Sequence, residues 1–211
     1  MSASFATRRW ISVARPATHG LELLGDGTSP IALRSTLDAA RESLHMNDAA
    51  FVLVRVASMD HLGIQAAFDV AARHSAVAHV TLAIDHWTLA RIDPGLIDTG
   101  RVGLVLDDID IDTPSSAMVH SAIEAVRFRR SFVTDATHRA RVGCALEAML
   151  GLARNLGVAT MGPVGAQRSS IQGVEFDYVQ SELVDDDPSI SPVGLREHEA
   201  QAIQQDRRPG R

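Results

Sequence analysis

The sequence predicts an α/β fold in which parallel strands alternate with helices. Short apolar runs without polar alternation, at 80–84 and 102–106, are typical of strands that are buried on both faces. Stretches with apolar residues three and four positions apart lie between such runs, and the longest is 137–156. This alternation favours parallel βαβ units. The 211 residues, 45% of them hydrophobic, suffice for a domain with a sizeable core.

The first half of the chain predicts an antiparallel strand pair followed by alternating helices and strands. Residues 10–14 and 20–24 fit two strands, with Pro16 and Gly20 as turn residues between them. Ser29 before Pro30 is a helix start, and apolar spacing continues that helix to residue 44. The elements that follow are a strand at 51–57, a helix at 62–74, a strand at 80–84 and a short helix or turn within 87–100.

The second half predicts two further helices and four strands. Gly157 is a natural stop for the best helix, 137–156. The other predicted elements are strands at 102–106, 126–129, 158–161 and 176–179, and a helix at about 115–124. Beyond Leu183 the chain becomes polar and rich in Asp and Pro. We therefore expect a folded domain over 1–184 and a polar linker and C-terminal tail over 185–211.

Composition limits the function classes. The formal net charge of −6 does not favour a nucleic-acid partner. The single cysteine, Cys144, predicts no internal disulfide and a reducing compartment. No apolar run reaches the roughly 18 residues of a membrane span, and no secretory signal is evident, so we expect a cytoplasmic protein without membrane contact. All twenty basic residues are arginine, which excludes any mechanism that needs a lysine.

A group of carboxylates follows the apolar run at 102–106. Asp107 and Asp108 end the run, and Asp110 and Asp112 come next. The C-terminal ends of strands are where α/β folds bind ligands, and carboxylates are the hard oxygen ligands that Mg²⁺ prefers. A solvated acidic loop after a strand explains the same residues without a ligand.

Several segments of this region resemble the EAL domain family, bacterial phosphodiesterases that hydrolyse cyclic di-GMP. The family pattern LALDDFGTGYSS followed by KIDRSFV resembles LVLDDIDIDTPSS at 104–116 and RFRRSFV at 127–133. Leu156-Gly157, Gln167 and EFDYVQSEL at 175–183 resemble the downstream family segments. The resemblance covers roughly 20–183. It implies an EAL-type (β/α) TIM-like barrel, and shortened intervals before Arg55 and after His86 predict one that is trimmed or incomplete.

The resemblance also identifies remnants of the family's ligand pocket. EAL phosphodiesterases hold two divalent cations that activate a water for attack on a phosphodiester. Among the family's pocket positions, the residues retained are Glu22, Asp107, Asp108 and Gln180. Glu22 is the least certain counterpart, because an ordinary strand or turn glutamate explains it equally well. Asp110 and Asp112 replace glycines of the family loop.

Three family positions carry residues that cannot do the family's chemistry. Arg55 replaces an Asn ligand, and an arginine has no lone pair to give a metal; we expect it to form an ion pair with Asp107 instead. His86 replaces a Glu, and a histidine is a poor ligand for Mg²⁺. Arg127 replaces the lysine and cannot transfer a proton near neutrality. With MGPVGAQ at 161–167 in place of the family's AEGVE, we predict no catalytic residues, no metal, no cofactor and no enzymatic activity.

The resulting hypothesis is a catalytically inactive EAL-like domain that acts as a protein-interaction module in signalling, for example in motility or biofilm control. The alternatives are a non-hydrolytic cyclic di-GMP receptor and a residual phosphodiesterase. Four carboxylates within 107–112 argue against binding of cyclic di-GMP, because they would repel its phosphates. The expected partners are an unidentified protein and a second copy of the chain, with Met118 and Val119 as candidate dimer contacts or, alternatively, core residues.

Overall fold

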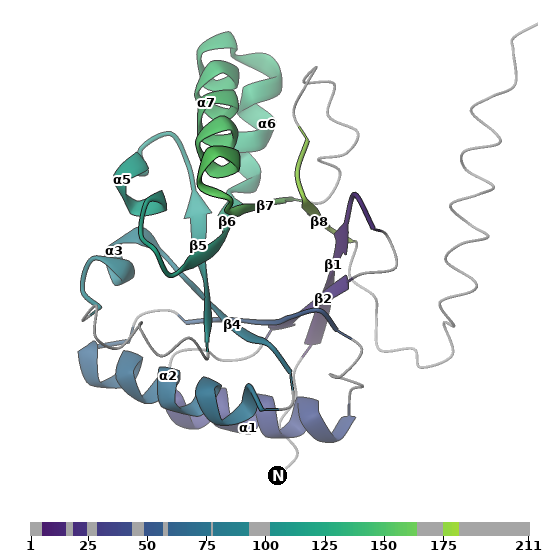
Figure 1. Cartoon of the computed structure of the whole chain (residues 1–211), viewed down its shortest axis with the longest axis vertical. Coiled ribbons are helices and arrows are strands. Elements are labelled where there is room, and N and C mark those ends of the chain that lie inside the picture. The colour runs from purple at the N-terminus through teal and green to yellow at the C-terminus, as the bar shows by residue number, and fades with distance from the viewer. Residues whose placement is uncertain are drawn as a thin grey trace, which may run out of the picture.

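In a computed structural model of the chain, the strands form a closed barrel with helices on its outside (Figure 1). The structure describes residues 6–15, 19–24, 29–43, 49–56, 59–76, 78–92, 102–163 and 175–181. The expected linker and tail at 185–211 lie outside the described residues, as does Gln167.

Eight strands and six helices make up the described part of the chain. The strands are β1 Ala6–Ser12, β2 His19–Leu24, β3 Val52–Arg55, β4 Val80–Ile84, β5 Gly103–Ile109, β6 Ile123–Phe128, β7 Ala159–Gly162 and β8 Tyr178–Gln180. The helices are α1 Pro30–Ser43, α2 His61–His74, α3 His86–Leu89, α5 Ser115–Met118, α6 Arg130–His138 and α7 Ala140–Leu156.

The barrel closes through β1, which pairs antiparallel with β2 on one side and with β8 on the other. The remaining neighbours, from β2 round to β8, all pair in parallel. The predicted antiparallel pair and parallel βαβ units are thus confirmed. The expectation of an incomplete barrel is wrong, because the eight described strands form an unbroken ring. What is short is the outer layer, where α3 and α5 are single turns of four residues.

The interior of the barrel is filled by one side chain from each of several strands. These side chains form a buried cluster separate from the larger one: Trp10, Leu53, Ala83, Val105, Ala125 and Met161. The larger cluster packs the outer faces of the strands against α1, α2, α6 and α7. Because successive strand residues point to opposite faces, the residues two positions after Leu53, Val105 and Ala125 also point into the barrel. That rule places Arg55, Asp107 and Arg127 inside the barrel, beyond the apolar layer.

Local sequence explains where the longer helices begin and end. The Asp60 carboxylate accepts a hydrogen bond of 2.7 Å from the Gly63 N–H and so caps α2. Gly157 ends α7 with φ of 70°, a left-handed conformation that glycine adopts at little cost. The predicted helix at 137–156 is shorter than expected at its start, since an extended Arg139 separates α7 from α6.

Two predicted elements differ from the structure between β5 and β6. The helix expected over 115–124 ends at Met118. The strand expected at 126–129 begins earlier, at Ile123, so the connection from the helix back to the barrel is short. Of the two candidate dimer contacts, Met118 is a core residue, 1% exposed, whereas Val119 is 58% exposed. Met118 is therefore excluded as a surface contact.

Candidate functional site

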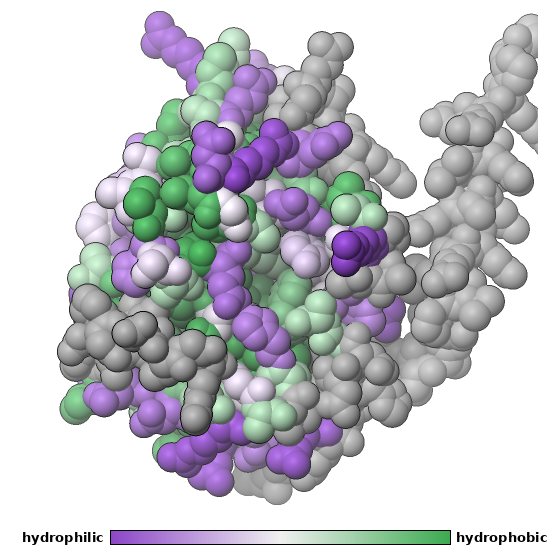
Figure 2. All heavy atoms as spheres, viewed as in Figure 1, coloured by the Kyte–Doolittle hydropathy of each residue, from purple (hydrophilic) through white to green (hydrophobic). Residues whose placement is uncertain are grey.

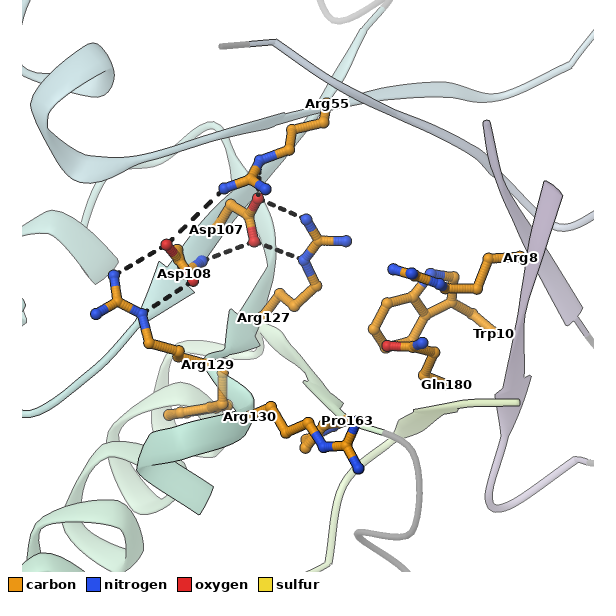
Figure 3. Close-up of a pocket in the computed structure, with 11 residues that line it drawn as sticks. Arg8, Trp10, Arg55, Asp107, Asp108, Arg127, Arg129, Arg130, Pro163 and Gln180 are labelled. Atoms are coloured by element: carbon orange, nitrogen blue, oxygen red, sulfur yellow. Dashed lines mark hydrogen bonds and ion pairs between the residues drawn. The ribbon is translucent and has the colours of Figure 1, made fainter. Parts of the chain in front are cut away.

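Charged side chains from four strands, β1, β3, β5 and β6, and from the start of α6 line a cavity of about 150 Å³ at the C-terminal end of the parallel strands (Figure 3). The strand alternation that fills the barrel with apolar residues carries these side chains into the next layer. The wall consists of Arg8, Trp10, Arg55, Asp107, Asp108, Arg127, Phe128, Arg129, Arg130, Pro163 and Gln180. Five arginines and two aspartates thus face a small space.

Arg127 connects the acidic residues of the cavity. Its Nε donates to Asp107 Oδ1 and its Nη2 to Asp107 Oδ2, both at 2.5 Å. Its Nη1 donates to Glu22 Oε1, also at 2.5 Å. The guanidinium carbon lies 5.7 Å from the centre of the Trp10 ring, a cation–π distance. One planar cation therefore joins β2, β5 and β6 at the centre of the barrel.

The charge of Arg127 is permanent. Burial alone would lower the pKa of the guanidinium, but the hydrogen bonds and negative charges of Asp107 and Glu22 outweigh burial and raise that pKa above its ordinary value. The two carboxylates are almost fully buried, at 4% and 2% exposed. A buried carboxylate is costly unless it is paired, so Arg127 stabilises both.

Glu22 receives two further donors. Arg8 Nη1 lies 3.3 Å and Trp10 Nε1 lies 3.1 Å from its Oε2 atom. Both donors come from β1, whose Arg8 is directly opposite Glu22 in the strand register. Both carboxylate oxygens of Glu22 therefore already accept hydrogen bonds from the protein.

Asp108 occupies an irregular position at the end of β5. The pairing of β5 with β6 shifts register between Leu106 and Ile109, and Asp108 has φ of 62°. A β-bulge redirects side chains in this way. The Asp108 N–H donates to Asp107 Oδ1 at 2.7 Å, which fixes the two carboxylates relative to each other.

Two more arginines neutralise these aspartates. Arg129 holds Asp108 at 2.9 and 3.1 Å and Asp110 at 2.7 Å. This hydrogen bond lowers the pKa of Asp108. Arg55 Nε lies 3.2 Å from Asp107 Oδ2 and Arg55 Nη2 lies 3.8 Å from Asp108 Oδ2, as expected for the ion pair with Asp107. Asp107, Asp108 and Asp110 are therefore each paired with at least one arginine, and the expectation that four unbalanced carboxylates face a phosphate is wrong.

The structure brings together most residues that the sequence singled out. Glu22, Asp107, Asp108, Arg55 and Arg127 form the charge network, and Gln180 lies in the same cavity wall. His86 does not line this cavity; it begins α3, and its ring lies 4.5 Å from that of Trp87.

Sequence reasoning missed five cavity residues: Arg8, Trp10, Phe128, Arg130 and Pro163. Arg8 and Trp10 are two positions apart on β1, a period that places them on one strand face. That spacing was the available signal. The spacing alone does not tell which face of β1 points into the barrel; that follows only once β1 is known to close the barrel between β2 and β8.

This arrangement does not fit the pair of divalent cations that EAL phosphodiesterases use. The Arg127 guanidinium, which donates to three of the four oxygens of Asp107 and Glu22, would repel a cation between these carboxylates, and Arg8 and Trp10 donate to the fourth oxygen. Within the described residues, no group of three or more His, Cys, Asp or Glu is arranged to hold a metal ion.

The closed eight-stranded barrel has the same fold as solved EAL domains, which confirms the fold predicted from the sequence. No protein-family pattern and no curated protein matches this sequence. In the described part of the chain, no helix has the length and hydropathy needed to cross a membrane.

Among solved structures, the EAL domain of Mycobacterium smegmatis DcpA has 13% identity and a TM-score of 0.61, over 99% of this chain and 98% of that one. The Pseudomonas aeruginosa FimX EAL domain bound to c-di-GMP has 13% identity and a TM-score of 0.57, over 85% and 88%. The PaMucR phosphodiesterase in complex with c-di-GMP has 13% identity and a TM-score of 0.58, over 85% and 89%. At this identity the likeness establishes the fold.

Proposed function

We propose that this chain is a catalytically inactive EAL-like domain that acts in cyclic di-GMP signalling by binding a protein partner. The observation that carries the proposal is the position of Arg127, whose guanidinium occupies the space between Asp107 and Glu22. A guanidinium held there would repel a metal ion at the same place, and it cannot itself act as a base that activates a water.

The surface near α5 supports the partner-binding part of the proposal. Hydrophobic side chains gather on the side of the molecule where α5 lies (Figure 2). Two exposed apolar residues flank that helix, Ile111 at 51% and Val119 at 58%. We include a homodimer through this surface in the proposal, because a two-fold contact is the commonest way to cover such residues.

A hydrolysis assay tests the loss of catalysis. The full chain is incubated with cyclic di-GMP and Mg²⁺ or Mn²⁺ beside an active EAL phosphodiesterase, and no linear product is expected. Asp107→Asn serves as the matched control, since it removes a carboxylate charge at the site. Turnover by the unaltered chain that disappears in Asp107→Asn would contradict the proposal.

The second candidate is a cyclic di-GMP receptor that binds without hydrolysis. Solved structures of FimX and PaMucR contain c-di-GMP, and the arginines of the cavity neutralise the aspartates that would otherwise repel phosphates. The small volume of the cavity weighs against this candidate. Calorimetry with cyclic di-GMP distinguishes the two candidate functions. A dissociation constant at or below about 1 μM, roughly −8 kcal/mol, would favour the receptor over the protein-binding module.

A further inference from the structure

The narrowest seam of the barrel lies between β7 and β8. Strand β8 has three residues, Tyr178–Gln180, and it pairs with β7 through Tyr178 and Val179 alone. Among the described strands, no other neighbouring pair has so short a ladder. On its other side β8 pairs with β1 (Figure 1). Because few backbone pairings hold β8, its local opening should cost less free energy than that of a longer, fully buried strand.

Asp177, the residue just before β8, is held by several hydrogen bonds. Its Oδ2 atom accepts from the Thr160 N–H at 2.8 Å and from the Thr160 hydroxyl at 2.7 Å. The Asp177 N–H donates to the Thr160 carbonyl oxygen at 3.0 Å, and the Asp177 carbonyl oxygen accepts from the Val13 N–H at 2.9 Å. Asp177 therefore ties the start of β8 to β7 on one side and to the end of β1 on the other.

Phe176 adds an apolar anchor at the same point. Its side chain is buried, and its ring centre lies 5.8 Å from that of Phe128. A Cβ atom at Gly162 would lie 2.6 Å from Phe176 Cδ2, so the ring lies directly against the backbone of β7, an approach that glycine permits. Phe176 and Asp177 together fix the chain immediately before β8.

We propose that β8 is a strap, hinged at Phe176 and Asp177, that opens one side of the barrel while the other described strands stay paired. Gln180, the last residue of the strap, lies in the cavity wall beside Arg8 and Trp10 (Figure 3). Opening of the strap removes Gln180 from that wall and separates β1 from β7. The cavity of about 150 Å³ belongs to the closed state, and the open state has a side entrance between β1 and β7.

This inference goes beyond the proposed function and does not depend on it. The hydrolysis assay reads bond cleavage in cyclic di-GMP, whereas the strap is tested by the exchange of backbone amides in the chain without any ligand. An inactive domain without a strap, or an active domain with one, would each be recognised as such.

Hydrogen–deuterium exchange of the full chain, read by mass spectrometry, tests the strap. Peptides that cover 176–181 report on β8, and peptides that cover 80–84 report on β4, which is buried along its whole length. After correction for intrinsic rates, we expect the β8 amides to exchange at least about tenfold faster than the β4 amides, because local openings require far less free energy than global unfolding.

Two variants test the hinge, each with a matched control. Gly162→Ala places a Cβ against the Phe176 ring and should speed β8 exchange about fivefold or more, as overpacking destabilises a tight contact. Its control is Gly151→Ala on α7, where an added Cβ meets no atom within 4 Å. Thr160→Val keeps the side-chain shape but removes the hydroxyl that donates to Asp177, so it should act in the same direction. Its control is Thr137→Val, which removes a hydroxyl that donates to the Thr134 carbonyl oxygen on α6.

Faster exchange of β8 in Gly162→Ala and Thr160→Val, with β4 and both controls unchanged, supports the strap. Exchange of β8 as slow as that of β4 in the unaltered chain would overturn the proposal. Equal acceleration of β8 and β4 in Gly162→Ala would also overturn it, because the barrel would then open only as a whole. If neither hinge variant alters β8 exchange, Phe176 and Asp177 are not its hinge.

Discussion

The Arg127 guanidinium and the Asp107 carboxylate are joined at two points, with Nε to Oδ1 and Nη2 to Oδ2 both at 2.5 Å. Such a paired geometry fixes the planes of both groups. The same guanidinium reaches Glu22 through its remaining nitrogen. Arg127 is thus a structural element of the barrel as well as the residue that fills the site.

Removing Arg127 should strongly destabilise the protein. Arg127→Met keeps most of the side-chain volume but leaves Asp107 and Glu22 buried with fewer donors. We expect a loss of about 3 kcal/mol in the free energy of unfolding, as for other broken buried ion pairs. Urea denaturation measures this loss. Arg34→Met, at an exposed i,i+4 pair with Asp38, is the control and should change stability by less than about 0.5 kcal/mol; equal effects would contradict the structural role of Arg127.

The backbone at Asp108 should reject β-branched residues. Its φ of 62° is left-handed, a conformation that aspartate tolerates better than most residues and valine does not. Asp108→Gly and Asp108→Val both remove the ion pair with Arg129, so their difference isolates the backbone. We expect Val to be less stable than Gly by about 1–2 kcal/mol in urea denaturation. Equal stabilities would show that the bulge rearranges.

Stability should show a weak pH dependence from the contact between His79 and Glu124. Their side chains are 2.8 Å apart, and the hydrogen bond raises the pKa of His79 above 6.5. A histidine with a raised folded-state pKa contributes stability that is complete below about pH 6.5 and is lost as the pH rises through the folded-state pKa. Both side chains are about half exposed, at 47% and 51%, so the contribution should be less than about 1 kcal/mol.

The measurement for this pair is the stability difference between the unaltered chain and Glu124→Gln, followed from about pH 6 to about pH 8.5. The difference should shrink towards high pH. Comparing the two proteins removes the opposite contribution of His74, whose pKa is lowered by burial. A difference that is constant over this range would contradict the assigned contact.

The proposed dimer should respond to Val119 and not to Met118. Val119→Asp places a charge on an exposed apolar position and should shift a dimer to monomer in light scattering at tens of micromolar. Met118→Asp should instead unfold the chain, because Met118 is 1% exposed and an unpaired charge would be buried. A monomer at this concentration in the unaltered chain would end the dimer proposal.

The sequence predicted strands best where both faces of the strand are buried, because such strands appear as continuous apolar runs. The strand at 80–84 matches β4 at both ends, since no polar alternation competes there. The helix α6 was missed because its buried residues, Phe132, Val133 and Ala136, cover barely two turns. Short helices of this kind depend on packing against neighbours, which no local pattern reveals.

For the site, sequence reasoning identified residues but not their arrangement. The pairing of Arg55 with Asp107 was expected and is confirmed. The bridge from Arg127 to Glu22 joins residues 105 positions apart, and such a contact follows only from the closed ring of strands. The covering of Asp110 by Arg129 also requires the bulge at Asp108, for which the sequence shows no glycine.

The closure of the barrel by β1 has a consequence for folding during synthesis. Trp10 lies on the first barrel strand to be synthesised, yet its strand partner Gln180 emerges only after every other barrel strand. Until then one edge of β1 and the final edge of the growing sheet lie open, and unpaired edges of this kind promote wrong association. The parallel pairings and this long-range closure also predict slow folding. Nascent chains of this protein should therefore depend on protection by chaperones until β8 is complete.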